Sequence, residues 1–161
     1  MKYQRLSTAE LESLKDDFIR FMASQGIDAE AWQKMKSGRI EEAEEIIEIY
    51  SDLVYDQALS KCIYLEHISA KEFKTIQYKD EEAIVLGLKV KDYSNINLNT
   101  DNFQKDVEQG LANNEIEVFT ATKKHENLRE QEMFEWIKNG AYMADETWFN
   151  QLQKLVDFQQ K

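Results

Sequence analysis

Residues 63–90 read IYLEHISAKEFKTIQYKDEEAIVLGLKV, and apolar and polar side chains alternate along much of this stretch. A period of two is typical of β-strands, because successive side chains of a strand point to opposite faces of the sheet. Three strands are predicted, at 63–68, 73–78 and 83–90, and the short connections between them predict an antiparallel meander. The third strand is apolar on both faces, so we expect it to be central and covered.

On the N-terminal side of this stretch, apolar residues recur at the helical period. A first helix is predicted from a capping box of Ser7 and Glu10 to the residue before Gly26. Asp28 is placed to cap a short second helix. A third and longer helix is predicted over about 40–60, where the apolar stripe is regular.

The C-terminal side returns to mixed elements. The polar segment 92–99 predicts a loop, and Asn99 or Thr100 can cap a helix that Gly110 closes. Residues 116–121 alternate as a fourth strand. Two more helices are predicted, at about 126–139 and 146–158.

This order predicts an α+β fold. We expect N-terminal helices, a mostly antiparallel sheet of about four strands, and C-terminal helices packed on it. A chain of 161 residues has the length of one ordinary domain, so a single domain over 1–161 is expected. With 42% hydrophobic and 32% charged residues, the composition is that of a globular protein and not of a disordered one.

The charge balance argues against one class of function, direct binding to nucleic acid. Lysine and arginine number 20 and aspartate and glutamate number 31, which gives a formal net charge of −11 at pH 7. A nucleic-acid-binding protein needs a basic face for the phosphates, so no direct nucleic-acid binding is expected.

The cysteine content and the apolar runs bear on the cellular setting. Cys62 is the only cysteine, so no disulfide can form within the chain, and a reducing, cytoplasmic setting is expected. The first residues lack the apolar core of a signal peptide. The longest apolar run, 83–88, is far shorter than the ~20 residues of a membrane span, so no membrane association is expected.

The polar side of the third predicted helix is acidic. No lysine or arginine lies between Arg39 and Lys61, and carboxylates four residues apart repel each other by about 0.2–0.5 kcal/mol per pair. The simplest interpretation is a solubilising surface. The functional interpretation is a docking surface for a basic protein, and a cation site is less favoured because a straight helix face converges poorly on one ion. The candidate partner-binding residues are Glu41, Glu44, Glu45, Glu48, Asp52 and Asp56.

Motifs of known catalytic sites are absent, so no catalytic residue, metal ligand or cofactor is assigned. Cys62 and His67 lie five residues apart along one predicted strand and point to opposite faces, so they cannot act together. His125, beside two lysines, is interpreted as part of a solvated turn. An alternative site is a pocket near the sheet that contains Glu66 and His67.

Several segments resemble a known family. They are MKYQRL at 1–6, FMASQGIDAEAW at 21–32, YSDLVY at 50–55 and YLEH at 64–67. The family comprises small uncharacterised bacterial proteins, a domain of unknown function, and the similarity runs over most of the chain. The resemblance implies a bacterial cytosolic protein and supplies no activity, substrate or catalytic residue.

These observations lead to three hypotheses. The first is a non-enzymatic interaction module that presents the acidic helix face to a basic protein partner. The second is a small enzyme or ligand-binding protein with a pocket around Glu66 and His67. The third, suggested by charge alone, is a mimic of nucleic acid that occupies a basic groove. Tyr55 and Leu59 lie off the apolar stripe and are expected to contact a partner or a neighbouring element, and the oligomeric state stays open.

Overall fold

A computed structural model describes the whole chain, residues 1–161. The chain forms two compact units, Met1–Ala58 and Leu59–Lys161, and each is described by itself below.

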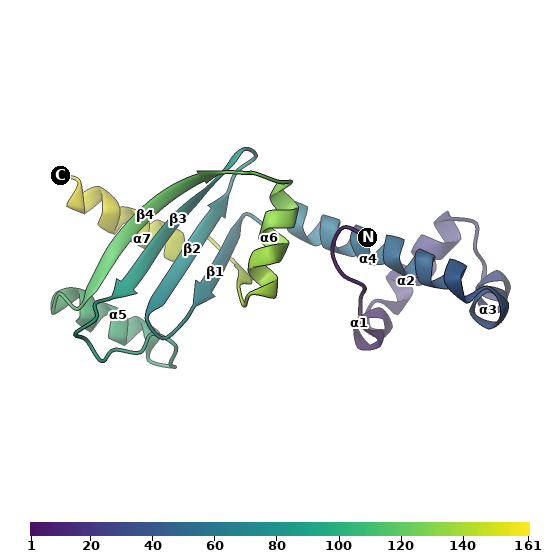
Figure 1. Ribbon diagram of the computed structural model, residues 1–161, viewed down its shortest axis with the longest axis horizontal. Coiled ribbons are helices and arrows are strands. Elements are labelled where there is room, and N and C mark those ends of the chain that lie inside the picture. The colour runs from purple at the N-terminus through teal and green to yellow at the C-terminus, as the bar shows by residue number, and fades with distance from the viewer. The chain divides into compact units, whose positions relative to one another are not determined.

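The first unit is helical (Figure 1). Its helices are α1 (Thr8–Ser13), α2 (Lys15–Ser24), α3 (Ala29–Gly38) and most of α4 (Ile40–Lys61). The predicted capping box is present, since the Ser7 hydroxyl accepts a hydrogen bond from the Glu10 N–H and the Glu10 carboxylate accepts one from the Ser7 N–H. Asp28 caps α3 by accepting a hydrogen bond from the Ala31 N–H at 2.8 Å.

An aromatic cluster packs the helices of this unit together. Phe18 and Phe21 of α2 contact Tyr50 of α4, with ring centroids 4.9 and 5.2 Å apart. Trp32 of α3 meets Phe18 edge-on at 5.4 Å. Because Tyr50 lies on the apolar side of α4, the packing leaves the acidic side of that helix on the surface.

The second unit is built on a five-stranded antiparallel sheet with the order β4-β3-β2-β1-β5. The strands are β1 (Tyr64–Ile68), β2 (Glu72–Tyr78), β3 (Glu82–Val90), β4 (Ile116–Lys124) and β5 (Tyr142–Ala144). The helices are α5 (Phe103–Ala112), α6 (Arg129–Lys138) and α7 (Thr147–Gln159). The predicted α+β class and the meander of the first three strands are confirmed.

In Figure 1, α5 and α7 lie behind the sheet and α6 lies beside β1. On one face, Phe73 and Tyr64 lie 5.6 and 5.5 Å from the rings of Trp148 and Phe149 in α7. Residues of opposite parity point to the other face, where Trp136 of α6 contacts His67 at 5.8 Å. The main core lies between the first face and α5 and α7, and its buried residues are Phe73, Leu86, Leu88, Val90, Leu98, Val107, Ile116, Phe149, Leu152 and Val156.

The structure differs from the sequence-based prediction at several points. The first predicted helix is two helices, because Leu14 leaves the helical conformation at φ −104°, ψ 18°. The sheet has five strands and not four, since the three-residue strand β5 is too short to show an alternation. Strand β4 continues to Lys124, beyond the apolar part of its sequence, because the backbone ladder with β3 runs on. No helix is both long enough and apolar enough to cross a membrane.

Candidate functional site

All six candidate partner-binding residues lie on α4, and they are named here the acidic face: Glu41, Glu44, Glu45, Glu48, Asp52 and Asp56. The opposite side of α4 carries the buried residues Ala43, Ile47 and Tyr50. Three of the six are exposed and three are half-buried. Asp52, Asp56 and Glu44 are contacted by a part of the chain that the helix pattern did not predict to lie there.

That part is the N-terminal segment, residues 1–6, which runs along α4 from Asp56 to Glu44. The backbone N–H groups of Lys2 and Tyr3 both donate to the Asp52 carboxylate, at 2.7 and 3.1 Å. The Lys2 ammonium lies 2.9 Å from the Asp56 carboxylate, and the Tyr3 hydroxyl donates to the same group at 2.6 Å. A basic peptide segment is therefore bound by two neighbouring carboxylates of α4.

Arg5 and Leu6 hold the other end of the N-terminal segment. The Arg5 guanidinium donates to Glu44 at 2.8 Å. The Leu6 N–H donates to the Ser51 hydroxyl at 3.0 Å, and this hydroxyl donates to the Ile47 carbonyl at 2.7 Å. Leu6 and Ser51 are both buried, so water does not compete for the first of these bonds.

The electrostatics of Asp56 follow from these contacts. Burial raises the pKa of the Asp56 carboxyl, but the hydrogen bonds from Tyr3 and Lys2 and the charge of Lys2 outweigh burial and lower the pKa below its ordinary value. The carboxyl is therefore ionised at neutral pH and keeps its ion pair with Lys2.

The rest of the acidic face is unpaired. Glu41, Glu45 and Glu48 make no hydrogen bond or ion pair in the structure, and these three residues are named here the free half. Next to them on the same helix, Ile49 is 50% exposed and Leu53 is 38% exposed. The free half is thus a surface of uncompensated carboxylates beside exposed apolar side chains.

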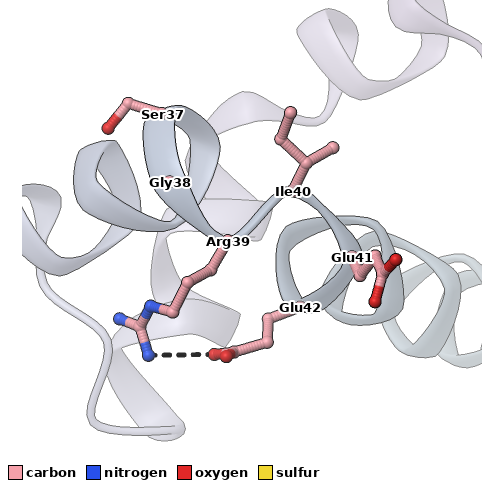
Figure 2. Close-up of a pocket in the computed structure, with 6 residues that line it drawn as sticks. All are labelled: Ser37, Gly38, Arg39, Ile40, Glu41 and Glu42. Atoms are coloured by element: carbon pink, nitrogen blue, oxygen red, sulfur yellow. Dashed lines mark hydrogen bonds and ion pairs between the residues drawn. The ribbon is translucent and has the colours of Figure 1, made fainter.

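A shallow depression of about 420 Å³ lies at the start of the free half, where α3 joins α4. Figure 2 shows its lining residues, with Arg39 and Glu42 joined by an ion pair of 3.0 Å. In the same view the side chain of Glu41 points away from that pair. Arg39 therefore compensates Glu42 and not Glu41.

Sequence reasoning missed Lys2, Arg5 and Ser51 as parts of this site. Two signals were available: two basic residues within the first five positions, and a serine on the apolar side of a helix. Tyr55, which was expected to contact a partner or a neighbouring element, accepts a hydrogen bond from the Gln4 amide at 2.9 Å and contacts the N-terminal segment. Leu59, given the same expectation, is fully buried.

The two residues of the alternative site are not brought together. Glu66 points to the face of β1 that α7 covers, and it is buried there. Its carboxyl is hydrogen-bonded to the Tyr142 hydroxyl of β5. Burial raises the pKa of Glu66; the bond from Tyr142 lowers it in part, and the charge of Asp145 raises it further. Beside Glu66 on the same face, the hydroxyl of Thr75 is buried without a hydrogen-bond partner.

His67 points to the opposite face of β1, toward α6. Its Nε2 lies 3.1 Å from the Asn139 carbonyl, and its ring meets Trp136 at a centroid distance of 5.8 Å. Since neighbouring residues of a strand face opposite ways, Glu66 and His67 cannot act on one substrate atom.

His125 is not part of a solvated turn, and that interpretation was wrong. Its side chain is only 6% exposed, with Nδ1 3.0 Å from the Glu132 carboxylate and Nε2 2.9 Å from the Lys79 carbonyl. The ring stacks on Tyr78 at 5.8 Å. Both ring nitrogens thus lie within hydrogen-bond distance of an oxygen from another element. His125 thus fastens the start of α6 to the hairpin of β2 and β3.

The thiol of Cys62 lies close to this cluster. It is half-buried and donates a hydrogen bond to the Tyr64 carbonyl at 3.2 Å. Burial raises the pKa of the thiol above its ordinary value, although the bond to Tyr64 and the charge of Arg129 act in the other direction. A thiol in this state is a poor nucleophile at neutral pH. No three His, Cys, Asp or Glu side chains are grouped so that they could hold a metal ion.

The helical unit also contains an apolar groove of about 670 Å³. Its walls come from α1, α2 and α3 and include Phe18, Met22 and Trp32. Its rim carries the charges of Lys15 and Lys36 as well as those of Glu12 and Asp28. Since the rim has both signs, the groove does not select a ligand by charge.

Comparison with known proteins places the chain in a family. No curated protein and no solved structure is significantly similar to it. The family of unknown function DUF6495 matches residues 1–157, nearly the whole chain, and agrees with the resemblance seen in the sequence. The chain therefore belongs to the DUF6495 family.

Proposed function

We propose that the protein is a non-enzymatic interaction module, and that the free half of the acidic face binds a basic peptide segment of a partner protein. One observation carries the proposal. The other three carboxylates of the same face, Asp52, Asp56 and Glu44, already bind such a peptide, the N-terminal segment.

The free half offers the same chemistry without an occupant. Glu41, Glu45 and Glu48 are unpaired carboxylates within one or two turns of each other, and they repel one another. Lysine or arginine side chains of a partner would remove this repulsion and form charge-assisted hydrogen bonds. The neighbouring Ile49 and Leu53 would add apolar contact, which a simple counterion cannot use.

This proposal is preferred to an enzyme or ligand-binding protein built around Glu66 and His67, because those side chains face opposite sides of the sheet. The proposed setting is the cytoplasm of a bacterial cell. The family resemblance and the single, weakly acidic thiol of Cys62 support that setting.

The test is partner capture from a native lysate at low and at high salt. The bait is the wild-type protein or a variant with Glu41→Lys, Glu45→Lys and Glu48→Lys. The control variant carries Glu81→Lys, Glu108→Lys and Asp157→Lys, all exposed positions outside α4, so both variants have the same net charge.

The proposal expects a discrete basic protein on the wild type and on the control variant at low salt, released by high salt, and absent from the α4 variant. If the control variant loses the protein as completely as the α4 variant does, capture depends on net charge alone and the proposal fails.

A further inference from the structure

Strand β4 forms an open edge of the sheet. It is nine residues long, and the strand order places it outermost, with β3 as its only neighbour (Figure 1). The side chains from Thr120 to Lys124 are exposed. Proteins usually protect a long edge, for example with lysines or a bulge, because it presents unpaired backbone groups. Here Lys123 and Lys124 stand at the end of the strand, and the segment from Val118 to Thr122 carries no charge.

Backbone hydrogen bonds show which groups of β4 point outward. The Glu115 carbonyl accepts from the Lys91 N–H at 2.8 Å, and the His125 N–H donates to the Glu81 carbonyl at 3.0 Å. The two residues that make these bonds from the β4 side, Glu115 and His125, both have odd numbers. In an antiparallel ladder every second residue of a strand bonds to the same neighbour, so the odd-numbered residues of β4 bond to β3. The backbone N–H and C=O groups that point away from β3 therefore belong to Ile116, Val118, Thr120, Thr122 and Lys124.

From this edge we infer that two copies of the chain associate through β4, antiparallel, with Thr120 of one copy opposite Thr120 of the other. The two sheets then form one continuous sheet across a two-fold axis. The outward N–H and C=O groups of each strand pair with the same groups of its partner.

The side chains of β4 are complementary to themselves in this register. Glu117 lies opposite Lys123, twice because of the symmetry, and Phe119 lies opposite the small Ala121. A register with Phe119 or Ala121 on the axis would separate Glu117 from Lys123. Lys123 is 63% exposed and lies 3.7 Å from Glu126 of its own chain, a surface contact that Glu117 of the partner can replace.

Phe119 is held in place for such a contact. It lies opposite Gly87 of β3, where an added Cβ would overlap the Phe119 ring. The ring thus lies over Gly87, and the proposed register sets the small side chain of the partner's Ala121 beside it.

The test measures the molar mass of the full chain by light scattering over a range of concentrations. The inference expects a dimer for the wild type. Glu117→Lys and Lys123→Glu should each weaken the dimer about tenfold or more, because like charges then lie opposite each other twice. The double variant Glu117→Lys with Lys123→Glu should restore the dimer, and an equimolar mixture of the two single variants should form a heterodimer.

A proline variant tests the backbone pairing. The N–H of Thr120 points away from β3, so Thr120→Pro removes an intermolecular donor and no bond within the sheet. The variant should have the circular dichroism spectrum of the folded wild type and the molar mass of a monomer by light scattering. A monomeric wild type, a dimer that survives both Glu117→Lys and Thr120→Pro, or a double variant that stays monomeric would each overturn the inference.

Discussion

Asp52 accepts hydrogen bonds from two consecutive backbone N–H groups, those of Lys2 and Tyr3. Asp52→Ala removes both bonds, and we expect the free energy of unfolding to fall by about 1 kcal/mol. Amide hydrogen exchange at Tyr3 should become faster in the same variant. Urea denaturation and exchange measured by NMR check the two effects.

Glu45→Ala is the matched control, since Glu45 lies on the same helix face without a partner. Its effect on the free energy of unfolding should stay within about 0.5 kcal/mol. Equal losses in the two variants would contradict the account of how the N-terminal segment is held.

Replacing Glu66 is expected to raise the free energy of unfolding, whereas replacing Asp52 is expected to lower it. The pKa of Glu66 is raised in the folded state, chiefly by burial, so the folded protein holds the proton more tightly than the unfolded chain does. Ionisation of Glu66 therefore lowers the stability as the pH rises above the ordinary pKa of a glutamate. Glu66→Gln should raise the free energy of unfolding at neutral pH, and the gain should vanish at a pH low enough to protonate the carboxyl in both states.

Denaturation at a series of pH values measures this difference. A constant difference between Glu66→Gln and the wild type across the series would show that the substitution acts through packing and not through the charge.

At the scale of elements, Arg129 joins α6 to two other segments. Its guanidinium donates to the backbone carbonyls of Leu59, Cys62 and Tyr78. Arg129→Met leaves these carbonyls without their donor, and we expect a loss of about 2–3 kcal/mol in the free energy of unfolding. Arg39→Met, which removes only an exposed ion pair with Glu42, should cost less than about 1 kcal/mol in thermal or urea denaturation.

The free half of α4 should lower the stability of the helix that carries it. Replacing Glu41, Glu45 and Glu48 by glutamine removes like-charge pairs, each worth about 0.2–0.5 kcal/mol. We expect the triple variant to be more stable than the wild type at low salt by up to about 1 kcal/mol, and equally stable at high salt, where the repulsion is screened. A variant that is less stable at low salt would mean that these carboxylates have partners within the molecule.

At the scale of the whole molecule, the elements that could be predicted from the sequence are those that arise from the periodicity of neighbouring residues. The meander of β1, β2 and β3, the long helix α4 and the capping box at Ser7 follow from neighbouring residues and are present. Strand β5 has three residues and exists because Tyr142, Met143 and Ala144 pair with β1, a contact between segments far apart in the chain. Such pairing has no local signal.

The same distinction between local pattern and distant contact applies to the candidate site. The spacing of the carboxylates on α4 could be predicted from the helical period alone. That Lys2 and Arg5 compensate half of them could not, because this depends on the path of a segment without secondary structure. The burial of His125 was missed for the same reason: Glu132 and Lys79, its partners, come from a helix and a hairpin that only the fold brings together.

The most direct test of the proposed peptide site is an NMR titration of the isotope-labelled full chain with a synthetic basic peptide. The peptide carries a lysine and an arginine three residues apart, as Lys2 and Arg5 are. The account predicts amide shifts concentrated on residues 41–53 of α4, and none of comparable size when Glu41, Glu45 and Glu48 are replaced by lysine. Shifts that leave α4 unchanged, or that persist in the lysine variant, would contradict it.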